Sequence, residues 1–252
     1  MNSKVGRWTL AVLAHLALLL AWYLFVRLGN VPKFVMPSPA ATLDALLQPN
    51  YGWWTNIAVT GTEIFVGYLL ALVVGVALAL SFTWSKVLEA FFMPLLVSLN
   101  MIPKVALGPL IIVWFKYGIF PNSIMAFSIA VFPILLTTAR GLREIEPELL
   151  DLVRSLKGSR WQLFTKIQLP GALPYIFSGM KVAAILAVAG AIVGEFLGSD
   201  KGLGYLMLQV QVTLDTPAMF MAVIMITAIG MLLYGVVLAL ERLLVVKDAR
   251  VV

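Results

Sequence analysis

The chain has 252 residues, of which 62% are hydrophobic and 12% are charged, with a mean hydropathy of +0.99. Several apolar runs reach the roughly 20 residues that cross a bilayer as a helix, so the composition excludes a soluble domain. The formal net charge of +6 gives no argument for nucleic acid, because cytoplasmic loops of membrane proteins collect Lys and Arg. With no Cys and one His, the sequence offers no disulfide, thiolate metal site or histidine cluster.

Six predicted spans indicate an all-α, polytopic membrane protein with one domain, residues 1–252. The spans cover residues 8–26, 59–82, 88–115, 122–138, 175–197 and 217–239. The first run is about one full span long and has no small-x-small cleavage site. We therefore expect it to remain as a helix and not to be removed as a secretory signal. A short helix at 40–47 is predicted in the loop before the second span.

The third predicted span is irregular because Pro94, Pro103 and Pro109 interrupt it. Such breaks persist in a membrane only where protein or a water-filled cavity satisfies the freed backbone groups. Lys104 lies near the middle, where a lysine costs about 2.5–3.5 kcal/mol on insertion scales. Two interpretations remain open, attraction of an anionic substrate or capping of the freed carbonyls. The candidate pathway residues in this bend are Asn100, Met101 and Lys104.

Other ionisable groups near the spans have competing interpretations. Glu195, at the end of the fifth span, is a further pathway candidate that either joins an external gate, packs against Tyr205, or lies half-exposed at the interface. Glu63, in the first turns of the second span, is expected to be a solvated interface residue. His15 is expected to be a packed imidazole in the first span.

The distribution of basic residues places both termini in the cytoplasm. Four basic residues fall on the predicted outer side, namely Arg27, Lys33, Lys116 and Lys201. The larger group falls inside, namely Lys4, Arg7, Lys86, Arg140, Arg143, Arg154, Lys157, Arg160, Lys166, Arg242, Lys247 and Arg250.

The predicted cytoplasmic loop, residues 140–170, has a helix, break, helix pattern. Pro147 suits the first position of one helix, and Gly158 is predicted to form its left-handed stop. Ser159 is placed to cap a second helix, which is predicted to end at Pro170.

The first loop helix carries an apolar stripe at i, i+3, i+4 and i+7 spacing, formed by Leu149, Leu152, Val153 and Leu156. A short helix outside the bilayer must bury such a face. Either a protein partner or the membrane surface, where basic residues meet anionic lipid, would cover it.

This loop resembles the cytoplasmic signature of ABC importer permeases, written E-A-A, three residues, G, nine residues, I, any residue, L-P. Its end matches at Ile167, Leu169 and Pro170. The signature glutamate then falls on Asp151, the two alanines on Leu152 and Val153, and the glycine on Lys157. Aspartate keeps the charge, Leu and Val are bulkier than Ala, and Gly158 directly follows Lys157.

Three flanking stretches are similar to the nitrate/sulfonate/taurine-type permeases, so the resemblance covers nearly the whole chain. They are MPSPAATLDAL from Met36, PKVALGPLIIVWFKYG from Pro103 and AIVGEFLGSDKGLGYLM from Ala191. The resemblance implies a type I importer-like fold in a bacterial inner membrane, in which the permease passes a small anionic solute. It also implies a second permease copy, an external solute-binding protein and a cytoplasmic ATPase dimer.

The resemblance implies that the loop is a coupling helix that docks on the ATPase. The expected docking residues are Glu148, Leu149, Asp151, Leu152, Val153, Arg154, Leu156, Lys157, Gly158, Arg160 and Trp161. The sequence contains no glycine-rich phosphate loop with a Lys-Ser/Thr ending. The chain is therefore expected to be no enzyme and to hold no cofactor, with ATP and Mg bound by the ATPase.

Two other classes of protein are alternatives. An ion-gradient-driven secondary transporter would show inverted halves and buried carboxylates, whereas the acidic residues here fall mainly in loops and near span ends. A membrane enzyme would need a catalytic cluster, and no such group of His, Cys or carboxylates stands out. Both alternatives leave the signature loop unexplained.

Overall fold

The computed structural model describes residues 4–144 and 147–245, and every regular element in these two segments is helical. The helices, in chain order, are α1 (Lys4–Leu28), α2 (Pro39–Asp44), α3 (Trp53–Trp84), α4 (Lys86–Met101), α5 (Lys104–Phe115), α6 (Ile119–Arg143), α7 (Pro147–Ser155), α8 (Arg160–Leu163), α9 (Leu169–Gly198), α10 (Leu203–Val212) and α11 (Thr216–Leu244). Short 3-10 turns at Ala45–Leu47 and Pro49–Tyr51 lead into α3, and a π-helical turn at Phe164–Gln168 joins α8 to α9.

Four helical segments are long and apolar enough to cross a membrane, namely Pro49–Trp84, Ile119–Arg143, Arg160–Gly198 and Thr216–Leu244. Helices α4 and α5 meet the same criterion only together, with a bend of 88° between them. The apolar part of α1, Val12–Leu28, is shorter. The all-α, polytopic fold is thus confirmed, and a count of six spans requires α4–α5 and α1 as the two additional spans.

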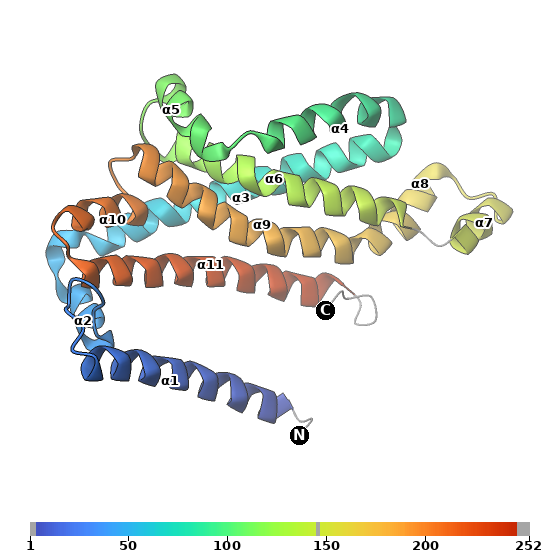
Figure 1. Cartoon of the computed structure of the whole chain (residues 1–252). Coiled ribbons are helices and arrows are strands. Elements are labelled where there is room, and N and C mark those ends of the chain that lie inside the picture. Colours follow the sequence, from blue (N-terminus) through green and yellow to red (C-terminus); the bar gives the residue numbers. More distant parts are fainter. Residues whose placement is uncertain (1–3, 145–146, 246–252) are drawn as a thin grey trace.

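The core of the molecule is formed by α3, α6 and α9, which lie side by side (Figure 1). Ala126 of α6 is fully buried between the other two helices. A Cβ added at Gly67 of α3 would lie 2.5 Å from the Ala126 Cβ, and one added at Gly190 of α9 would lie 2.6 Å from the Ala126 Cα. Glycine at both positions therefore lets the three backbones approach closely, as in membrane helix pairs.

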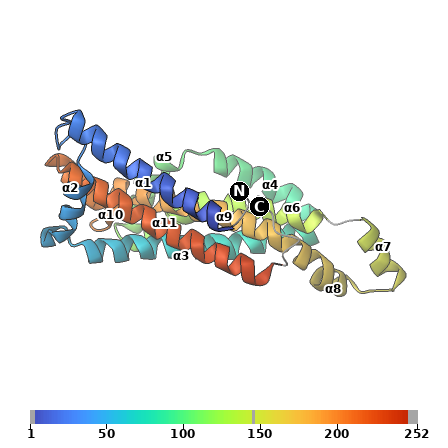
Figure 2. The ribbon, with the colours of Figure 1, turned by 90° about the horizontal axis from the view of Figure 1, so that it is seen from below.

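The two ends of this bundle differ. Helix α10 and α2 lie at one end, and α7 extends beyond the other end (Figures 1 and 2). The short predicted helix at 40–47 is confirmed by α2 and the turn that follows it. In the text below these are the α10 end and the α7 end.

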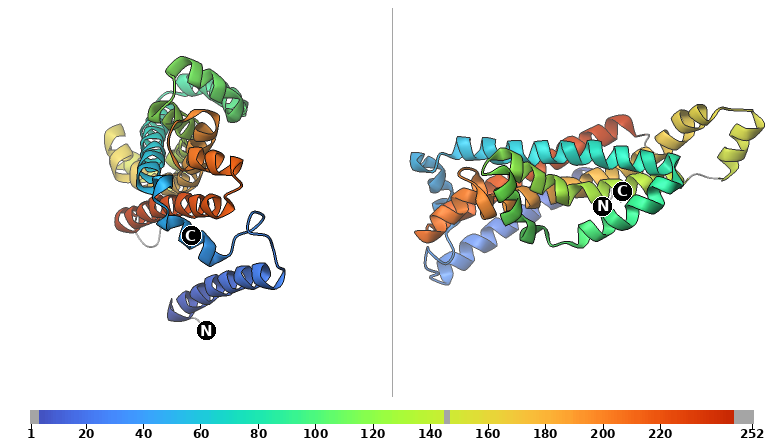
Figure 3. Two further views of the ribbon diagram at one scale, coloured as in Figure 1. Left: turned by 90° about the vertical axis from the view of Figure 1, so that its left-hand side faces the viewer. Right: turned by 90° about the horizontal axis from the view of Figure 1, so that it is seen from above.

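Helix α1 lies apart from the bundle and joins it near its own last turns (Figures 1 and 3). Trp22 makes this attachment, because its indole N–H donates to the Pro37 carbonyl at 3.0 Å and its ring lies 5.7 Å from that of Phe220. Most described side chains of α1 are exposed apolar groups, including Leu13, Leu18 and Phe25.

The predicted interruption of the third span coincides with the break between α4 and α5, at Ile102 and Pro103. Pro94 and Pro109 lie inside helices instead. Lys104 opens α5, and its Nζ donates to the Leu99 carbonyl oxygen at 2.8 Å. The lysine therefore caps a carbonyl of the last turn of α4, as the second of its two interpretations proposed.

The predicted end of the second loop helix at Pro170 is wrong. Helix continues from Arg160 to Gly198, with Pro170 in the first turn of α9. Proline has no N–H and its ring collides with the carbonyl four residues earlier in a regular helix. The π-helical turn at Phe164–Gln168, in which the Leu169 N–H donates to the Phe164 carbonyl, widens the helix there and accommodates the proline.

Candidate functional site

The loop between α6 and α9 extends as a separate arm beyond the bundle (Figures 1 and 3). Its helix α7 and the turn directly after it carry the predicted apolar stripe, and three leucines of this stripe are open to solvent. Leu149 is 37% exposed, Leu152 is 52% exposed and Leu156 is 73% exposed. These three residues are called the docking face below.

Val153 departs from the predicted stripe because it packs within the loop itself. A Cβ added at Gly158 would lie 2.6 Å from Val153 Cγ1, and Val153 is partly buried. Val153 thus holds the turn against α7 and takes no part in the exposed face.

The turn after α7 is left-handed at Lys157, with φ 52°, and not at Gly158 as the sequence predicted. The Gly158 N–H donates to the Val153 carbonyl at 2.8 Å, which is the six-residue closure of a Schellman stop. Lys157 therefore takes the conformation that glycine adopts most easily. It is also the residue that aligned with the signature glycine, so a lysine holds a left-handed backbone at that position.

Helix α8 starts at a full capping box, which confirms the predicted role of Ser159. Gln162 N–H donates to Ser159 Oγ at 3.2 Å, and Ser159 N–H donates to Gln162 Oε1 at 2.8 Å. The start of this helix is thereby fixed relative to the turn that follows α7.

Aromatic contacts connect α8 to α3. Trp161 is 65% exposed, and its ring centroid lies 5.7 Å from that of buried Phe164. Phe164 in turn meets Trp84, the last residue of α3, edge to face at 5.5 Å. These contacts link α8 to the end of α3.

The base of the arm is closed by contacts between α6 and α9. A Cβ at Gly141 would lie 2.5 Å from the Tyr175 Cβ, so the two helices touch there. A hydrogen bond with Tyr175, together with Arg140, lowers the pKa of the Glu144 carboxyl below its usual range. The Arg140–Glu144 ion pair itself is exposed, with an N–O distance of 3.3 Å.

The remaining predicted docking residues lie on the surface of the arm. Exposed side chains are those of Glu148, Asp151, Lys157 and Arg160. The side chain of Arg154 lies outside the part that the structure describes.

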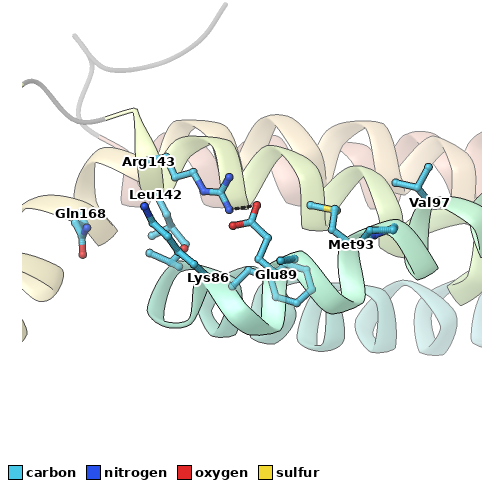
Figure 4. Close-up of a pocket in the computed structure, with 11 residues that line it drawn as sticks. Lys86, Glu89, Met93, Val97, Leu142, Arg143 and Gln168 are labelled. Atoms are coloured by element: carbon cyan, nitrogen blue, oxygen red, sulfur yellow. Dashed lines mark ion pairs between the residues drawn. The ribbon is translucent and has the colours of Figure 1, made fainter.

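A pocket of about 900 Å³ lies between α3, α4 and α6 at the α7 end (Figure 4). Its apolar wall includes Phe82, Met93 and Val97, and Gln168 of the π-helical turn borders it. Arg143 and Glu89 point toward each other across the pocket and form an ion pair (Figure 4).

Lys86 also borders this pocket, so two basic groups face one carboxylate there. An anionic group fits that charge balance. This pocket was not predicted from the sequence. The close spacing of Lys86 and Glu89 at the start of α4 was the available signal, but their meeting with Arg143 depends on tertiary structure.

The four predicted pathway residues do not form one cluster of contacts. Asn100 and Met101 are exposed at the end of α4, and Lys104 caps α4. Glu195 belongs to the α10 end and is only 1% exposed, so its half-exposed interpretation is wrong. It does pack against Tyr205, whose backbone N–H donates to Glu195 Oε2 at 3.2 Å.

The expectation for Glu63 is also wrong, because this residue is fully buried at 0% exposure. Glu63 lies on the face of α3 that packs against α6, where Asn122 Nδ2 donates to Glu63 Oε1 at 2.8 Å. The spans therefore do contain buried carboxylates, and their supposed absence no longer argues against a gradient-driven transporter. Family membership decides that question.

A bundle of apolar, membrane-length helices with a projecting polar arm defines a polytopic membrane protein. Residues 67–246 match the family model described as binding-protein-dependent transport system inner membrane component. The chain therefore belongs to this family, the inner membrane permeases of ABC importers, and the expected resemblance is confirmed.

Three curated relatives agree with this assignment. A probable ABC transporter permease protein of Haemophilus influenzae is 36% identical over 217 residues, covering 86% of this chain and 89% of the relative. The riboflavin transport system permease protein of Chloroflexus aurantiacus is 34% identical, covering 92% and 87%. A putative aliphatic sulfonates transport permease protein of Escherichia coli is 30% identical, covering 96% and 94%.

The fold is also similar to that of a solved ABC transporter. An amino acid ABC transporter crystallised with histidines matches with a TM-score of 0.56 and 16% identity, covering 75% of this chain and 90% of that chain. The chain is thus a multi-pass inner membrane permease with the type I importer fold.

Proposed function

We propose that the docking face on α7 inserts into a groove of a cytoplasmic ATPase, and that an ATPase dimer drives transport through this permease. The observation that carries the proposal is the exposure of Leu149 and Leu152 on a helix that projects from the bundle, and of Leu156 in the turn directly after it. An amphipathic helix that lays its apolar face into a groove is a recurrent mode of recognition between proteins. A membrane-surface role for α7 is the competing interpretation.

ATP hydrolysis belongs to the partner in this account. Because the sequence has no glycine-rich phosphate loop with a Lys-Ser/Thr ending, ATP and Mg would be bound by the ATPase dimer, and this chain would act as permease alone.

Three contacts support transmission of the movement from the arm. The capping box at Ser159 fixes the start of α8, and the Trp161–Phe164–Trp84 contacts reach α3. Gln168, at the end of the π-helical turn, borders the pocket formed with α4. Closing of the ATPase dimer would thereby reorient α3 and α4 and change which side of the membrane the pathway faces. Nucleotide and the loaded binding protein can shift that equilibrium only by binding one state more tightly.

A second copy of the chain completes the pathway in this proposal. Helices α1, α4 and α5 expose many apolar side chains, including Leu13, Phe91 and Val113, and α1 packs little against its own chain. Lipid and a second permease are both apolar enough to cover these helices. In the dimer, the residues at the break between α4 and α5, namely Asn100, Met101 and Lys104, would line the pathway.

The α7 end would face the cytoplasm, with both termini there, because most basic residues gather at that end. The α10 end would face the external solute-binding protein.

The relatives named for riboflavin and for aliphatic sulfonates differ in solute. Two basic side chains, Lys86 and Arg143, border the pocket with one carboxylate, Glu89. This excess of positive charge favours a small anionic solute here.

The proposal is tested by cross-linking. The chain has no cysteine, so Leu152→Cys introduces a single thiol on the docking face. With the complex in native membranes, a short thiol-to-amine cross-linker is expected to join this thiol to an ATPase. Leu47→Cys, an exposed leucine at the α10 end, is the control and is expected to give no such product. Cross-linking of Leu152→Cys to lipid alone would favour the membrane-surface interpretation.

A further inference from the structure

Two carboxyl groups are buried together at the α10 end, and the transport account does not use them. Glu63 of α3 is 0% exposed and Glu195 of α9 is 1% exposed. The two groups lie within hydrogen-bonding reach of one another. Asn122 of α6 and Thr60 of α3 complete the cluster, so it joins three helices of the core with α10.

The Glu195 carboxyl is surrounded by donors. Thr60 Oγ1 donates to its Oε1 at 2.5 Å, and the backbone N–H groups of Gly204 and Tyr205, in the first turn of α10, donate to its Oε2. Thr60 Oγ1 also accepts the Leu203 N–H at 2.8 Å. The positive end of the α10 dipole therefore faces this carboxylate and favours its ionised form.

The space around Glu195 depends on glycine. A Cβ added at Gly202, which has φ 114°, would lie 2.4 Å from the Glu195 Cδ, and one at Gly204 would lie 2.9 Å from its Oε2. The start of α10 is thus shaped around this one carboxyl group.

Glu63 has a different environment. Its Oε1 accepts from Asn122, but its Oε2 has no donor among the described residues. Asp200 adds negative charge near it, and in the part of the chain that the structure describes no ion pair links either carboxylate to Lys or Arg. Two buried carboxylates side by side repel, and an unpaired buried charge is costly.

We propose that Glu63 and Glu195 share one proton, held on Glu63 Oε2, which donates a hydrogen bond to Glu195. This assignment gives the unpartnered oxygen of Glu63 a partner and leaves one negative charge, on Glu195, opposite the N–H groups of α10. The proton-bridged pair would fix the start of α10 to α3, α6 and α9.

Glu63→Gln tests the proposal because its amide N–H₂ replaces the carboxylic O–H as donor without a charge. In infrared spectra of the purified permease, the carbonyl band of a protonated carboxylic acid is expected in the wild type and is expected to be lost in Glu63→Gln. Glu89→Gln is the control, since the Glu89 carboxylate is paired with Arg143, and it is expected to keep the band. An acid band unchanged in Glu63→Gln would overturn the proposal.

Hydrogen exchange provides the second measurement. Glu63→Gln is expected to leave the exchange of the Gly204 and Tyr205 amides at the wild-type rate, whereas Glu195→Gln is expected to accelerate it at least about tenfold, because their charged acceptor is lost. If Glu63→Gln fails to fold while Glu63→Asp folds, a carboxylate is needed at this position and the proposal is wrong. Exchange that is as fast in Glu63→Gln as in Glu195→Gln would contradict it equally.

Discussion

Phe164 of the π-helical turn and Trp84 at the end of α3 meet edge to face, with ring centroids 5.5 Å apart and an angle of 66° between the planes. The contact joins the arm to the core through two residues that are far apart in the sequence. Because Phe164 is 8% exposed and Trp84 is 64% exposed, the pair lies at the boundary between core and surface.

Phe164→Leu is expected to keep ATPase binding but to weaken its coupling to transport. Leucine retains most of the apolar volume and loses the aromatic contacts, a stabilisation of about 0.5–1.5 kcal/mol. The ratio of solute transported to ATP hydrolysed, measured in proteoliposomes, should fall. Phe65→Leu, at an exposed aromatic on α3, is the control. An unchanged ratio in Phe164→Leu would show that the contact transmits nothing.

Lys157→Gly is expected to stabilise the turn after α7 and to leave assembly with the ATPase intact. The left-handed conformation at φ 52° costs a non-glycine residue about 1–2 kcal/mol, and glycine avoids this cost. Glycine also makes the unfolded chain more flexible, which lowers the stability of the folded state by about 0.4–1 kcal/mol. The net gain should therefore be small and appear as slower proteolysis of the arm.

Lys157→Val is the contrasting variant for the same turn, since a β-branched residue is worse than lysine at positive φ. It should accelerate proteolysis. Loss of ATPase binding in Lys157→Gly would instead show that the lysine side chain, and not the backbone conformation, is what the partner needs.

The base of the arm should loosen in acid. The pKa of Glu144 is lowered from its ordinary value of 4.5, first by the hydrogen bond with Tyr175 and then by Arg140. A depressed pKa means that the ionised carboxylate stabilises the folded state above the ordinary pKa, and that this contribution is lost as the pH falls through the folded value.

The measurement compares thermal unfolding of the wild type with that of Glu144→Gln across pH. The wild type should melt higher at neutral pH, and the difference should shrink below pH 4.5. Tyr175→Phe should reduce the difference at neutral pH. A difference that does not vary with pH would exclude the carboxylate as its source.

Lys181 of α9 and Glu241 of α11 form a largely buried ion pair, with an N–O distance of 3.0 Å and side-chain exposures of 18% and 4%. Lys181→Met should lower the free energy of unfolding by about 3–5 kcal/mol, because it leaves the Glu241 charge without its partner. Lys181→Met combined with Glu241→Leu should recover most of this loss in detergent unfolding. Additive losses in the double variant would mean that the two charges act independently.

Much of this architecture could be predicted from the order of apolar and polar residues. The proline break before Lys104, the short helix after Ser38 and the cap at Ser159 depend on local chemistry, and each lies where the sequence placed it. The α7 stripe followed from helical spacing in the same way. Such features need no knowledge of which helices touch.

The errors concern tertiary contacts and neighbouring residues. Glu63 and Glu195 are buried by partners that are distant in the sequence, since Thr60 lies 135 residues from Glu195 and Asn122 lies 59 residues from Glu63. Hydrophobic periodicity does not show that these residues, or the glycines at the start of α10, come together. The left-handed residue was assigned to Gly158 because glycine is the usual choice, yet the six-residue closure from Val153 places Lys157 there. The continuous helix through Pro170 needed a π-helical turn, which has no simple sequence pattern.

Co-purification is the decisive test of whether the docking face on α7 binds an ATPase. Tagged wild-type chain and a variant with Leu149, Leu152 and Leu156 changed to Asp would be purified in mild detergent from native cells, with partner identification and a vanadate-sensitive ATPase assay. Leu47→Asp at the α10 end is the matched control. An ATPase is expected to accompany the wild type and the control and to be lost from the folded triple variant. An ATPase retained equally by the folded triple variant would contradict it.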